Sequence, residues 1–250
     1  MKAGDQSQSE VVEVYNSRIA ELTALRENWE YMTSKHLCDS ALLADAGLSD
    51  AEVLNVGCFF PLDEIALVHR VKHWTATDLG ESTIRFAEEA AKAELHPDLF
   101  SRLSFEVADG TALQYEDASF DVVVSLSTVD HVVSPEGRER FVREMARVTR
   151  PGGRVVITVP NRWNRGYAQR ERLYGAKTEF FEHCFSPLEL RRVATRAGLR
   201  VTRMTSTAEV PVLAPRAFLP RLDPRRPVLS TYNRVARFLG SRMGLLAVKP

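Results

Sequence analysis

The chain of 250 residues carries 33 basic and 33 acidic side chains, so no overall electrostatic field draws it to nucleic acid or to a membrane. Its apolar fraction of 44% supports a sizeable core, and its length suits one elaborated α/β domain. The three cysteines form no CxxC pair, which argues against a disulfide framework and favours a reducing, cytoplasmic compartment. The sequence predicts neither an apolar leader nor a membrane-spanning run.

Two amphipathic helices are predicted in residues 1–50, which we interpret as a helical cap over the mouth of a site. Ser9 is the expected N-cap of the first helix, which reaches about residue 29. The apolar stripe of this helix consists of Val12, Tyr15, Ile19 and Leu22. The second helix is expected over residues 35–46 and ends at Gly47.

Strands and helices alternate over residues 51–206, a pattern that predicts a doubly wound, mostly parallel α/β sheet. The expected strands are residues 53–56, 72–79, 102–108, 120–125, 154–159 and 199–204. The expected helices are residues 62–70, 81–95, a segment from 135 to a stop at 150–153, and 187–197.

Residues 207–250 are expected to complete the same domain with a proline-rich loop, a short helix after Ser230 and a last strand at 242–249. Charge is uneven along the chain: residues 201–250 hold nine Lys or Arg and two acids. A basic surface there would favour an anionic or lipid-linked acceptor, or peripheral membrane contact. An ordinary solvated face is an equally good interpretation.

Glycine or acidic signals follow three successive predicted strands. Gly57 follows the first, Asp78 ends the second, and Asp109 with Gly110 follows the third. In a doubly wound sheet such strand ends meet in one crevice, where ligands bind. A carboxylate at the second end can accept both hydroxyls of a ribose, and a polar group at the third can reach an adenine amine. The pattern therefore predicts a pocket for an adenosine-containing ligand.

Five segments together resemble the class I S-adenosylmethionine-dependent methyltransferases, especially the group that acts on small molecules, quinones, lipids and sugars. They are residues 53–57, the TDL around Asp78, ADG at 108–110, FDVVVSLSTVDHV at 120–132 and VTRPGGRVVITVPN at 148–161. The resemblance covers about residues 50–205. It implies a Rossmann-like sheet of seven strands with an antiparallel last strand, and S-adenosylmethionine as the cofactor.

The resemblance also implies roles for individual residues. Gly57 and its neighbours would hold the methionine end of the cofactor, Asp78 the ribose, Asp109 with Gly110 the adenine, and Ser125 would line the reaction centre. The full set of expected cofactor contacts is Asn55, Gly57, Cys58, Phe59, Asp78, Leu79, Asp109, Gly110, Thr111 and Ser125.

The sequence departs from the family pattern in the loop after the first strand. The family usually has an acid where Asn55 stands, and glycines where Phe59 and Pro61 stand. Asn55 lacks the charge, Pro61 has no N–H to donate, and Phe59 would crowd the cofactor unless its ring turns to the core. Asp63 or Glu64 would replace the missing carboxylate, or both are simply acids favoured at a helix N-terminus.

Methyl transfer needs mainly an acceptor held close and in line with the sulfonium group. A hydroxyl acceptor also needs a base, and His131 with Asp130 beside it, just after the fourth strand, is the expected candidate. A structural histidine is the alternative, because the family often uses a histidine here in that way. No metal site is expected: His69 and His73 have suitable spacing but span the end of a helix and the start of a strand.

The predicted function is therefore methyl transfer to an oxygen or nitrogen of a small-molecule or lipid- or sugar-linked acceptor. A non-catalytic binding or scaffold protein on the same fold is the main alternative, supported by the altered glycine loop. An NAD(P)-dependent oxidoreductase is less favoured because Gly57 stands alone without a G-x-G-x-x-G fingerprint. Nucleic-acid modification is not expected: the chain is neutral, and Ser125-Leu126-Ser127-Thr128 stands where an Asn-Pro-Pro-aromatic tetrad would be.

Overall fold

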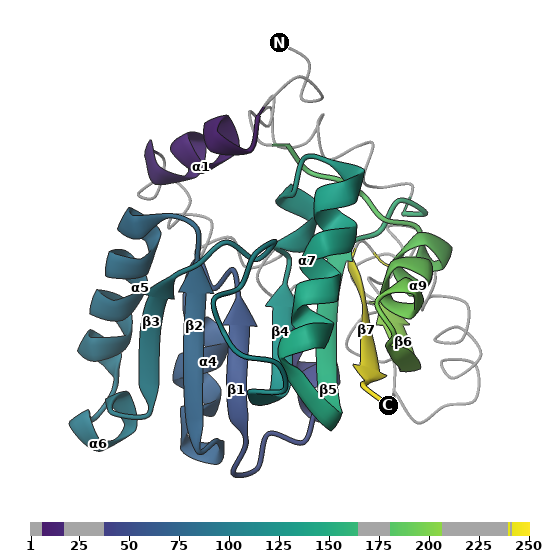
Figure 1. Ribbon diagram of the computed structural model, residues 1–250. Coiled ribbons are helices and arrows are strands. Elements are labelled where there is room, and N and C mark those ends of the chain that lie inside the picture. Colours follow the sequence, from purple (N-terminus) through teal and green to yellow (C-terminus); the bar gives the residue numbers. More distant parts are fainter. Residues whose placement is uncertain (1–6, 18–37, 165–180, 207–239, 241) are drawn as a thin grey trace, which may run out of the picture.

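The computed structural model describes residues 7–17, 38–164, 181–206, 240 and 242–250 (Figure 1). Seven strands form one sheet in the order β3-β2-β1-β4-β5-β7-β6. The strands are β1 (Glu52–Val56), β2 (His73–Asp78), β3 (Leu103–Val107), β4 (Phe120–Leu126), β5 (Thr149–Pro160), β6 (Arg200–Ser206) and β7 (Arg242–Val248). β7 runs antiparallel to both β5 and β6, and the pairs from β3 to β5 are parallel. The predicted doubly wound sheet with an antiparallel last strand is confirmed.

Helices cover both faces of the sheet, as the alternating pattern predicted. They are α1 (Gln8–Ser17), α4 (Leu62–Leu67), α5 (Glu81–Glu94), α6 (Pro97–Phe100), α7 (Pro135–Val148) and α9 (Pro187–Arg196), with 3₁₀ turns η3 (Val68–Arg70) and η4 (Val129–His131). Figure 1 shows α7 in front of the sheet and α4 behind it, with α1 above the carboxyl ends of the strands. The connection order reverses between β1 and β4, which creates a switch point at that upper edge.

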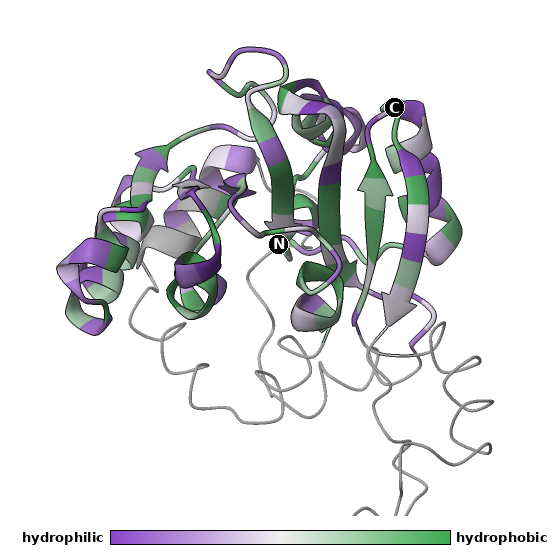
Figure 2. Ribbon diagram, turned by 90° about the horizontal axis from the view of Figure 1, so that it is seen from below, coloured by the Kyte–Doolittle hydropathy of each residue, from purple (hydrophilic) through white to green (hydrophobic). Residues whose placement is uncertain are grey.

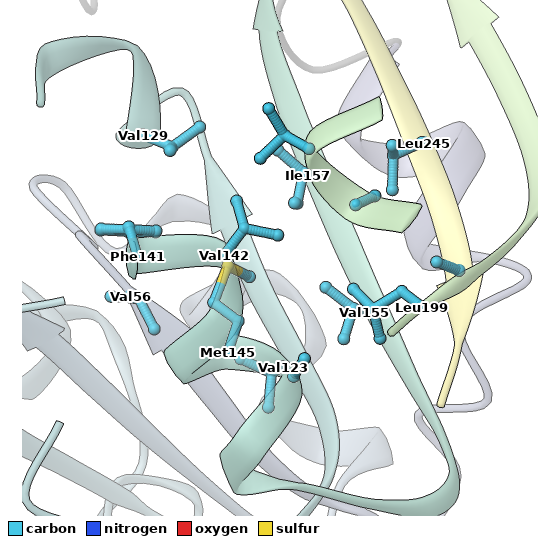
Figure 3. Packing of buried hydrophobic residues seen from close by; sticks show 14 of the residues in the cluster. Val56, Val123, Val129, Phe141, Val142, Met145, Val155, Ile157, Leu199 and Leu245 are labelled. Carbon is cyan, nitrogen blue, oxygen red and sulfur yellow. The ribbon is translucent and has the colours of Figure 1, made fainter. Parts of the chain in front are cut away.

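The larger core lies between α7, α9 and the front of the sheet (Figure 3). Phe141, Val142 and Met145 of α7 are buried and pack over the strands that carry Val56 and Val123. Spacings of one, three and four residues place these side chains on one face of the helix. The opposite face of the sheet is covered by residues 42–51, η3 and α5, around the fully buried Trp74. Seen from below, the central strands are mostly hydrophobic, and exposed helix turns carry hydrophilic residues (Figure 2).

Capping side chains fix the ends of several helices. Ser134 accepts a hydrogen bond from the Gly137 N–H (2.9 Å), and the predicted capping box of Ser186 and Glu189 is present. The prediction of Ser9 as the first N-cap was wrong. The helix begins at Gln8, and Ser7 makes reciprocal hydrogen bonds with Glu10 three residues later.

Two further boundaries differ from the prediction. β5 begins at Thr149, because this residue pairs with Phe120 before a register shift, and Gly152 and Gly153 exchange hydrogen bonds with Lys249. The helix expected over 62–70 tightens into a 3₁₀ turn after Leu67. The continuation of the first helix, the proline-rich loop and the helix after Ser230 lie outside the described residues. The proposed division at residues 50 and 206 stays a prediction, although β7 does join the core sheet. Within the described part of the chain, no helix is both long and apolar enough to cross a bilayer.

Candidate active site

Backbone hydrogen bonds join the carboxyl ends of β1, β2 and β3 at the upper edge of the sheet. The N–H groups of Gly57 and Cys58 both donate to the Thr77 carbonyl, at 2.7 and 2.8 Å. The Ala108 N–H donates to the Asp78 carbonyl at 2.9 Å. The strand ends that the sequence analysis singled out therefore lie at one edge, tied together by the backbone.

The glycine at position 57 is required by a neighbouring loop. Its φ of +89° lies in the left-handed region, and a Cβ there would fall 2.0 Å from Thr128 Cγ2. Thr128 Oγ1 also donates to the Gly57 carbonyl at 2.9 Å. Glycine at this position makes room for the Thr128 side chain from the loop after β4, and its expected contact with the cofactor stays a prediction.

The loop after Gly57 turns its next N–H groups toward β2. Phe59 adopts a φ of +43°, and its N–H donates to Asp78 Oδ2 at 3.2 Å. Phe60 packs its ring against Phe86 of α5, with centroids 5.7 Å apart. Burial raises the pKa of the Cys58 thiol, and the charges of Asp78 and Glu64 raise it further, so this thiol stays protonated. The predicted crowding of the cofactor by Phe59 stays a prediction.

Asp78 holds its carboxylate at the end of β2 by two backbone donors. The Gly80 N–H donates to Oδ1 at 3.1 Å, and the Phe59 N–H donates to Oδ2. Each oxygen therefore keeps acceptor capacity for a further donor. Two large apolar residues adjoin Asp78 in the chain and in the sheet: Leu79, the next residue, is 37% exposed, and Val107, its register partner on β3, is 54% exposed. An anchored carboxylate between exposed apolar groups suits a ligand that has both hydroxyls and a flat apolar ring.

Cofactor affinity is expected to fall on acidification because of Asp78. Burial raises the pKa of its carboxyl above the usual 3.8, opposed by the N–H groups of Gly80, Phe59 and Leu79. Protonation removes an acceptor for ribose hydroxyls, so affinity declines as pH falls through this raised pKa. The stability of the apo protein changes in the opposite direction. Protonation of Asp78 removes the free-energy cost of burying its charge, so the free energy of unfolding rises as pH falls through the same interval. Calorimetric titrations with S-adenosylmethionine between pH 7 and 4 check this, and Asp78→Asn should remove that component of the dependence.

The loop after β3 is organised by its own side chains. Asp109 Oδ1 accepts from both the N–H and the hydroxyl of Thr111, each at 2.8 Å. Gly110 is buried, and a Cβ on it would lie 2.1 Å from Phe141 Cε2 of α7. The glycine thus serves close helix packing, while the Asp109 turn stands next to the end of β2.

Asn55 contacts an acid that comes from the helix rather than from the strand. Its side-chain amide donates to Glu64 Oε1 at 2.6 Å, and both residues are buried. The Asn55 Oδ1 atom has no hydrogen-bond partner among the described residues. Asp63, the other acid at the start of α4, is also buried.

The end of β4 supplies polar groups on the other side of Gly57. Ser125 is fully buried, and its hydroxyl has no hydrogen-bond partner within the described part of the chain. Ser127 adopts a φ of +64°, and its N–H donates to the Thr158 carbonyl at 2.9 Å. This left-handed residue turns the chain sharply out of the sheet toward η4.

His131 and Asp130 lie together in η4, which follows β4. His131 Nδ1 is 2.8 Å from the Phe181 carbonyl, so Nδ1 carries a proton. Its Nε2 lies 3.4 Å from Oδ2 of Asp130, a residue with no exposed surface. Glu182 belongs to the same group: burial raises the pKa of its carboxyl, Asp130 adds to this, and His131 and Arg242 oppose it.

Sequence reasoning missed two contributors to this region. Gln8 of α1 contacts the loop after η4 with both ends of its amide, accepting from Val133 N–H at 3.1 Å and donating to the His131 carbonyl at 3.5 Å. Arg138 of α7 donates to the Val132 and Val133 carbonyls. No local pattern marks either residue, because both contacts depend on the folded course of the loop.

A second histidine near this loop has a structural role. His183 Nε2 lies 2.6 Å from Glu189 Oε1, the same side chain that caps α9. Burial lowers the pKa of His183, although Glu189 favours its charged form. Within the described residues no group of three or more His, Cys, Asp or Glu is arranged to hold a metal ion.

Comparison with known proteins finds similarity to methyltransferases in the central strands. Residues 54–157, which span β1 to β5, match a family model described as a methyltransferase domain. Over these residues the chain is similar to methyltransferase domains. This agrees with the family resemblance of the sequence segments and with the strand order of the sheet.

Two similar proteins are named as an N-methyltransferase and an O-methyltransferase. Norajmaline N-methyltransferase of Rauvolfia serpentina is 27% identical over 184 residues, covering 61% of this chain and 58% of that protein. Ubiquinone biosynthesis O-methyltransferase of Idiomarina loihiensis is 29% identical over 160 residues, covering 61% and 63%. The matches thus span about three-fifths of the length of these relatives.

A solved structure shares the fold over nearly the whole chain. It is the methyltransferase in a complex with the Trm112 methyltransferase activator of Haloferax volcanii. The superposition has a TM-score of 0.67 at 20% identity and covers 94% of this chain and 97% of that one.

Proposed function

We propose that this chain is a methyltransferase that binds S-adenosylmethionine and transfers its methyl group to a nitrogen or oxygen atom of a small-molecule acceptor. The observation that carries this proposal is the Asp78 carboxylate at the carboxyl end of β2, beside the switch point between β1 and β4. It is anchored by two backbone donors, with exposed Leu79 next in the chain and exposed Val107 as its register partner on β3. The N- and O-methyltransferase relatives support the acceptor class.

The residues at the edge fit the parts of this cofactor. Asp78 would accept the ribose hydroxyls, Leu79 and Val107 would contact the faces of the adenine, and the turn at Asp109 would approach its amine. The remaining expected contacts to the methionine end are Asn55, Gly57, Cys58 and Phe59. When bound, the cofactor supplies a methyl group already activated on a sulfonium sulfur.

The chain itself contributes position and a proton acceptor. The polar groups of η4 and the β4 end lie across Thr128 from the cofactor loop, so an acceptor held there faces the methionine end. The Phe181 carbonyl fixes the proton of His131 on Nδ1, which leaves Nε2 as the nitrogen that takes a proton from the acceptor. The nearby Asp130 carboxylate would stabilise the imidazolium that results.

Calorimetry with S-adenosylmethionine and S-adenosylhomocysteine tests the binding step. Saturable binding is expected, and absence of binding at millimolar ligand would contradict the proposal. Transfer of a labelled methyl group to a panel of amines and phenols then tests the reaction. A protein that binds the cofactor but labels nothing, while its cellular role survives Asp78→Ala, would instead fit a scaffold.

Replacing His131 by Gln should separate catalysis from binding. We expect kcat with a hydroxyl acceptor to fall about 100-fold, since general bases contribute that order of rate. The Kd for S-adenosylmethionine should stay within about threefold of wild type, because His131 faces the acceptor side. Single-turnover rates as a function of pH provide the measurement, and an unchanged rate and pH profile would assign His131 a structural role.

The anionic or lipid-linked acceptor and the membrane contact stay predictions. They depend on basic side chains of residues 201–250, most of which lie outside the described residues. Binding to anionic vesicles that weakens with added salt would support an electrostatic contact.

A further inference from the structure

Asp130 in η4 carries a buried carboxylate without hydrogen bonds from the described residues. The residue has no exposed surface, and neither Oδ1 nor Oδ2 has a hydrogen-bond partner in the described part of the chain. His131 Nε2 lies 3.4 Å from Oδ2, but with the proton on Nδ1 it becomes a donor only when the imidazole is protonated. A buried carboxylate is costly unless it is paired and hydrogen-bonded, and native proteins rarely keep one unsatisfied without a ligand, an ion or a water. Asp130 therefore marks a place for a donor that the described residues do not supply.

The segment that leads to Asp130 has further unused hydrogen-bonding capacity. The hydroxyl oxygens of Ser125 and Ser127 are buried, and neither has a hydrogen-bond partner among the residues described. Ser127 precedes Asp130 by three residues, where its φ of +64° turns the chain from β4 into η4. Polar groups that await a partner thus concentrate between the end of β4 and η4, the segment where the acceptor is proposed to bind.

The charges around Asp130 favour a cation over a neutral group. Burial raises the pKa of the Glu182 carboxyl, the charge of Asp130 raises it further, and His131 and Arg242 lower it. Two neighbouring acids repel each other unless a proton or a cation lies beside them. Arg138, the next basic residue after η4, donates instead to backbone carbonyls. A positive group next to Asp130 would relieve the repulsion between the two acids.

His131 relates this group of side chains to the proposed cofactor site. Burial raises the pKa of Asp78, whereas three backbone N–H groups and the charge of His131 lower it. The same imidazole thus acts on Asp78, the proposed ribose acceptor, and on the acids around Asp130. Thr128 of this loop also donates to the Gly57 carbonyl. The surroundings of Asp130 and the proposed cofactor site are therefore neighbours.

We propose that the methyl acceptor is an amine and that Asp130 binds its ammonium form beside His131. This inference rests on the proposed methyl transfer from S-adenosylmethionine, and it selects nitrogen rather than oxygen as the methylated atom. An ammonium group has only donors and a positive charge, so it matches the two unpartnered oxygens of Asp130. A hydroxyl group would supply one donor and no charge, which would leave the buried carboxylate poorly compensated.

Proton transfer to His131 prepares the nitrogen for the reaction. The ammonium gives one proton to His131 Nε2, so its nitrogen gains a lone pair and the positive charge passes to the imidazolium. Asp130 therefore faces a positive charge before and after this transfer. The nitrogen lone pair then forms a bond to the methyl carbon, the bond from that carbon to sulfur breaks, and its electron pair stays on sulfur. The product leaves as a methylated ammonium, and His131 gives its proton to solvent.

Matched amines and alcohols test the binding step. The probes are phenethylamine with 2-phenylethanol and tryptamine with tryptophol, titrated by calorimetry into the S-adenosylhomocysteine complex at pH 7. We expect the amine of a pair to bind at least about tenfold more tightly than its alcohol, since hydrogen bonds to charged groups have this strength. Asp130→Asn should reduce this preference to less than about twofold. Glu136→Gln removes an exposed acid at the start of α7 and should leave the preference unchanged.

Tyramine tests the choice of atom within one molecule, because it carries an amine at one end and a phenol hydroxyl at the other. Wild type is incubated with tyramine and S-adenosylmethionine labelled in the methyl group, and fragmentation in a mass spectrometer locates the label. We expect the label on nitrogen. A label on the phenol oxygen would overturn the proposal.

The binding experiment can also contradict the proposal. Wild type without an amine preference at millimolar probe would do so, and this result stands even if thermal unfolding shows that Asp130→Asn does not fold. An Asp130→Asn variant that weakens S-adenosylmethionine but not S-adenosylhomocysteine, and keeps the amine preference, would assign the carboxylate to the sulfonium charge instead. A chain that binds no S-adenosylhomocysteine contradicts the proposed function itself, whereas one that binds it but does not distinguish amine from alcohol contradicts only this inference.

Discussion

Replacing Asp78 by Asn is expected to weaken S-adenosylmethionine binding about 100-fold. Two charge-assisted hydrogen bonds to ribose hydroxyls lose strength, and a combined loss of about 3 kcal/mol corresponds to that factor. The amide of the Asp78→Asn variant cannot accept both of the backbone hydrogen bonds that the Asp78 carboxylate accepts. Phe59 and Gly80 donate to the two different oxygens, so the new NH2 group would face one of these N–H donors.

Isothermal titration calorimetry measures this effect. Asp98→Asn on α6 is a suitable control, because it removes an exposed acid with the same charge from another part of the fold. Its Kd should equal that of wild type. A change of less than about threefold in Asp78→Asn would show that the end of β2 does not hold the ribose.

Replacing Gly57 by Ala should lower the free energy of unfolding by about 2–5 kcal/mol. A left-handed backbone costs an L-residue about 1–2 kcal/mol, and its φ here is +89°. Forcing a methyl group into a filled site costs about 1–3 kcal/mol more, and this Cβ would lie 2.0 Å from Thr128 Cγ2. Urea unfolding followed by circular dichroism gives the comparison with wild type.

Gly198→Ala separates the two costs. Gly198 has a similar φ of +85°, but no described atom lies within 4 Å of its would-be Cβ. The free energy of unfolding of the Gly198→Ala variant should therefore fall only by the cost of the left-handed backbone, about 1–2 kcal/mol. Equal destabilisation in the two variants would show that the loop after β4 yields to the new methyl group.

Local patterns in the sequence were sufficient to predict the order and type of most helices and strands in the sheet. Strand β4 was recognisable from its continuous apolar run, and α7 from its apolar positions at Phe141, Met145 and Val148, because each pattern follows the geometry of a single element. The convergence of Asp78 and Asp109 at one edge follows from parallel strands in a doubly wound sheet. These features need no knowledge of distant contacts.

The reasons for particular residues at the site were harder to predict, because they depend on partners far away in the sequence. Gly57 is required by Thr128, and Gly110 by Phe141, and the sequence did not predict either packing partner; the ligand contacts expected of both glycines stay predictions. Because Asn55 stands where the family usually has an acid, Asp63 and Glu64 could be either replacements for that acid or ordinary helix N-terminal acids. The contact between Asn55 and Glu64 forms only when α4 folds back on β1. Gln8 acquires its role from a loop more than a hundred residues later.

Thr128 makes the two halves of the site mechanically dependent. Its hydroxyl donates to the Gly57 carbonyl in the loop proposed to bind the cofactor, and three residues later the same loop carries His131, the proposed proton acceptor. If the nucleoside binds as proposed, we expect a displacement of the β1–α4 loop to pass through this hydrogen bond to the loop that carries His131. Such a linkage favours a compulsory order of addition, in which the methyl donor arrives first and the acceptor cavity takes its final shape afterwards.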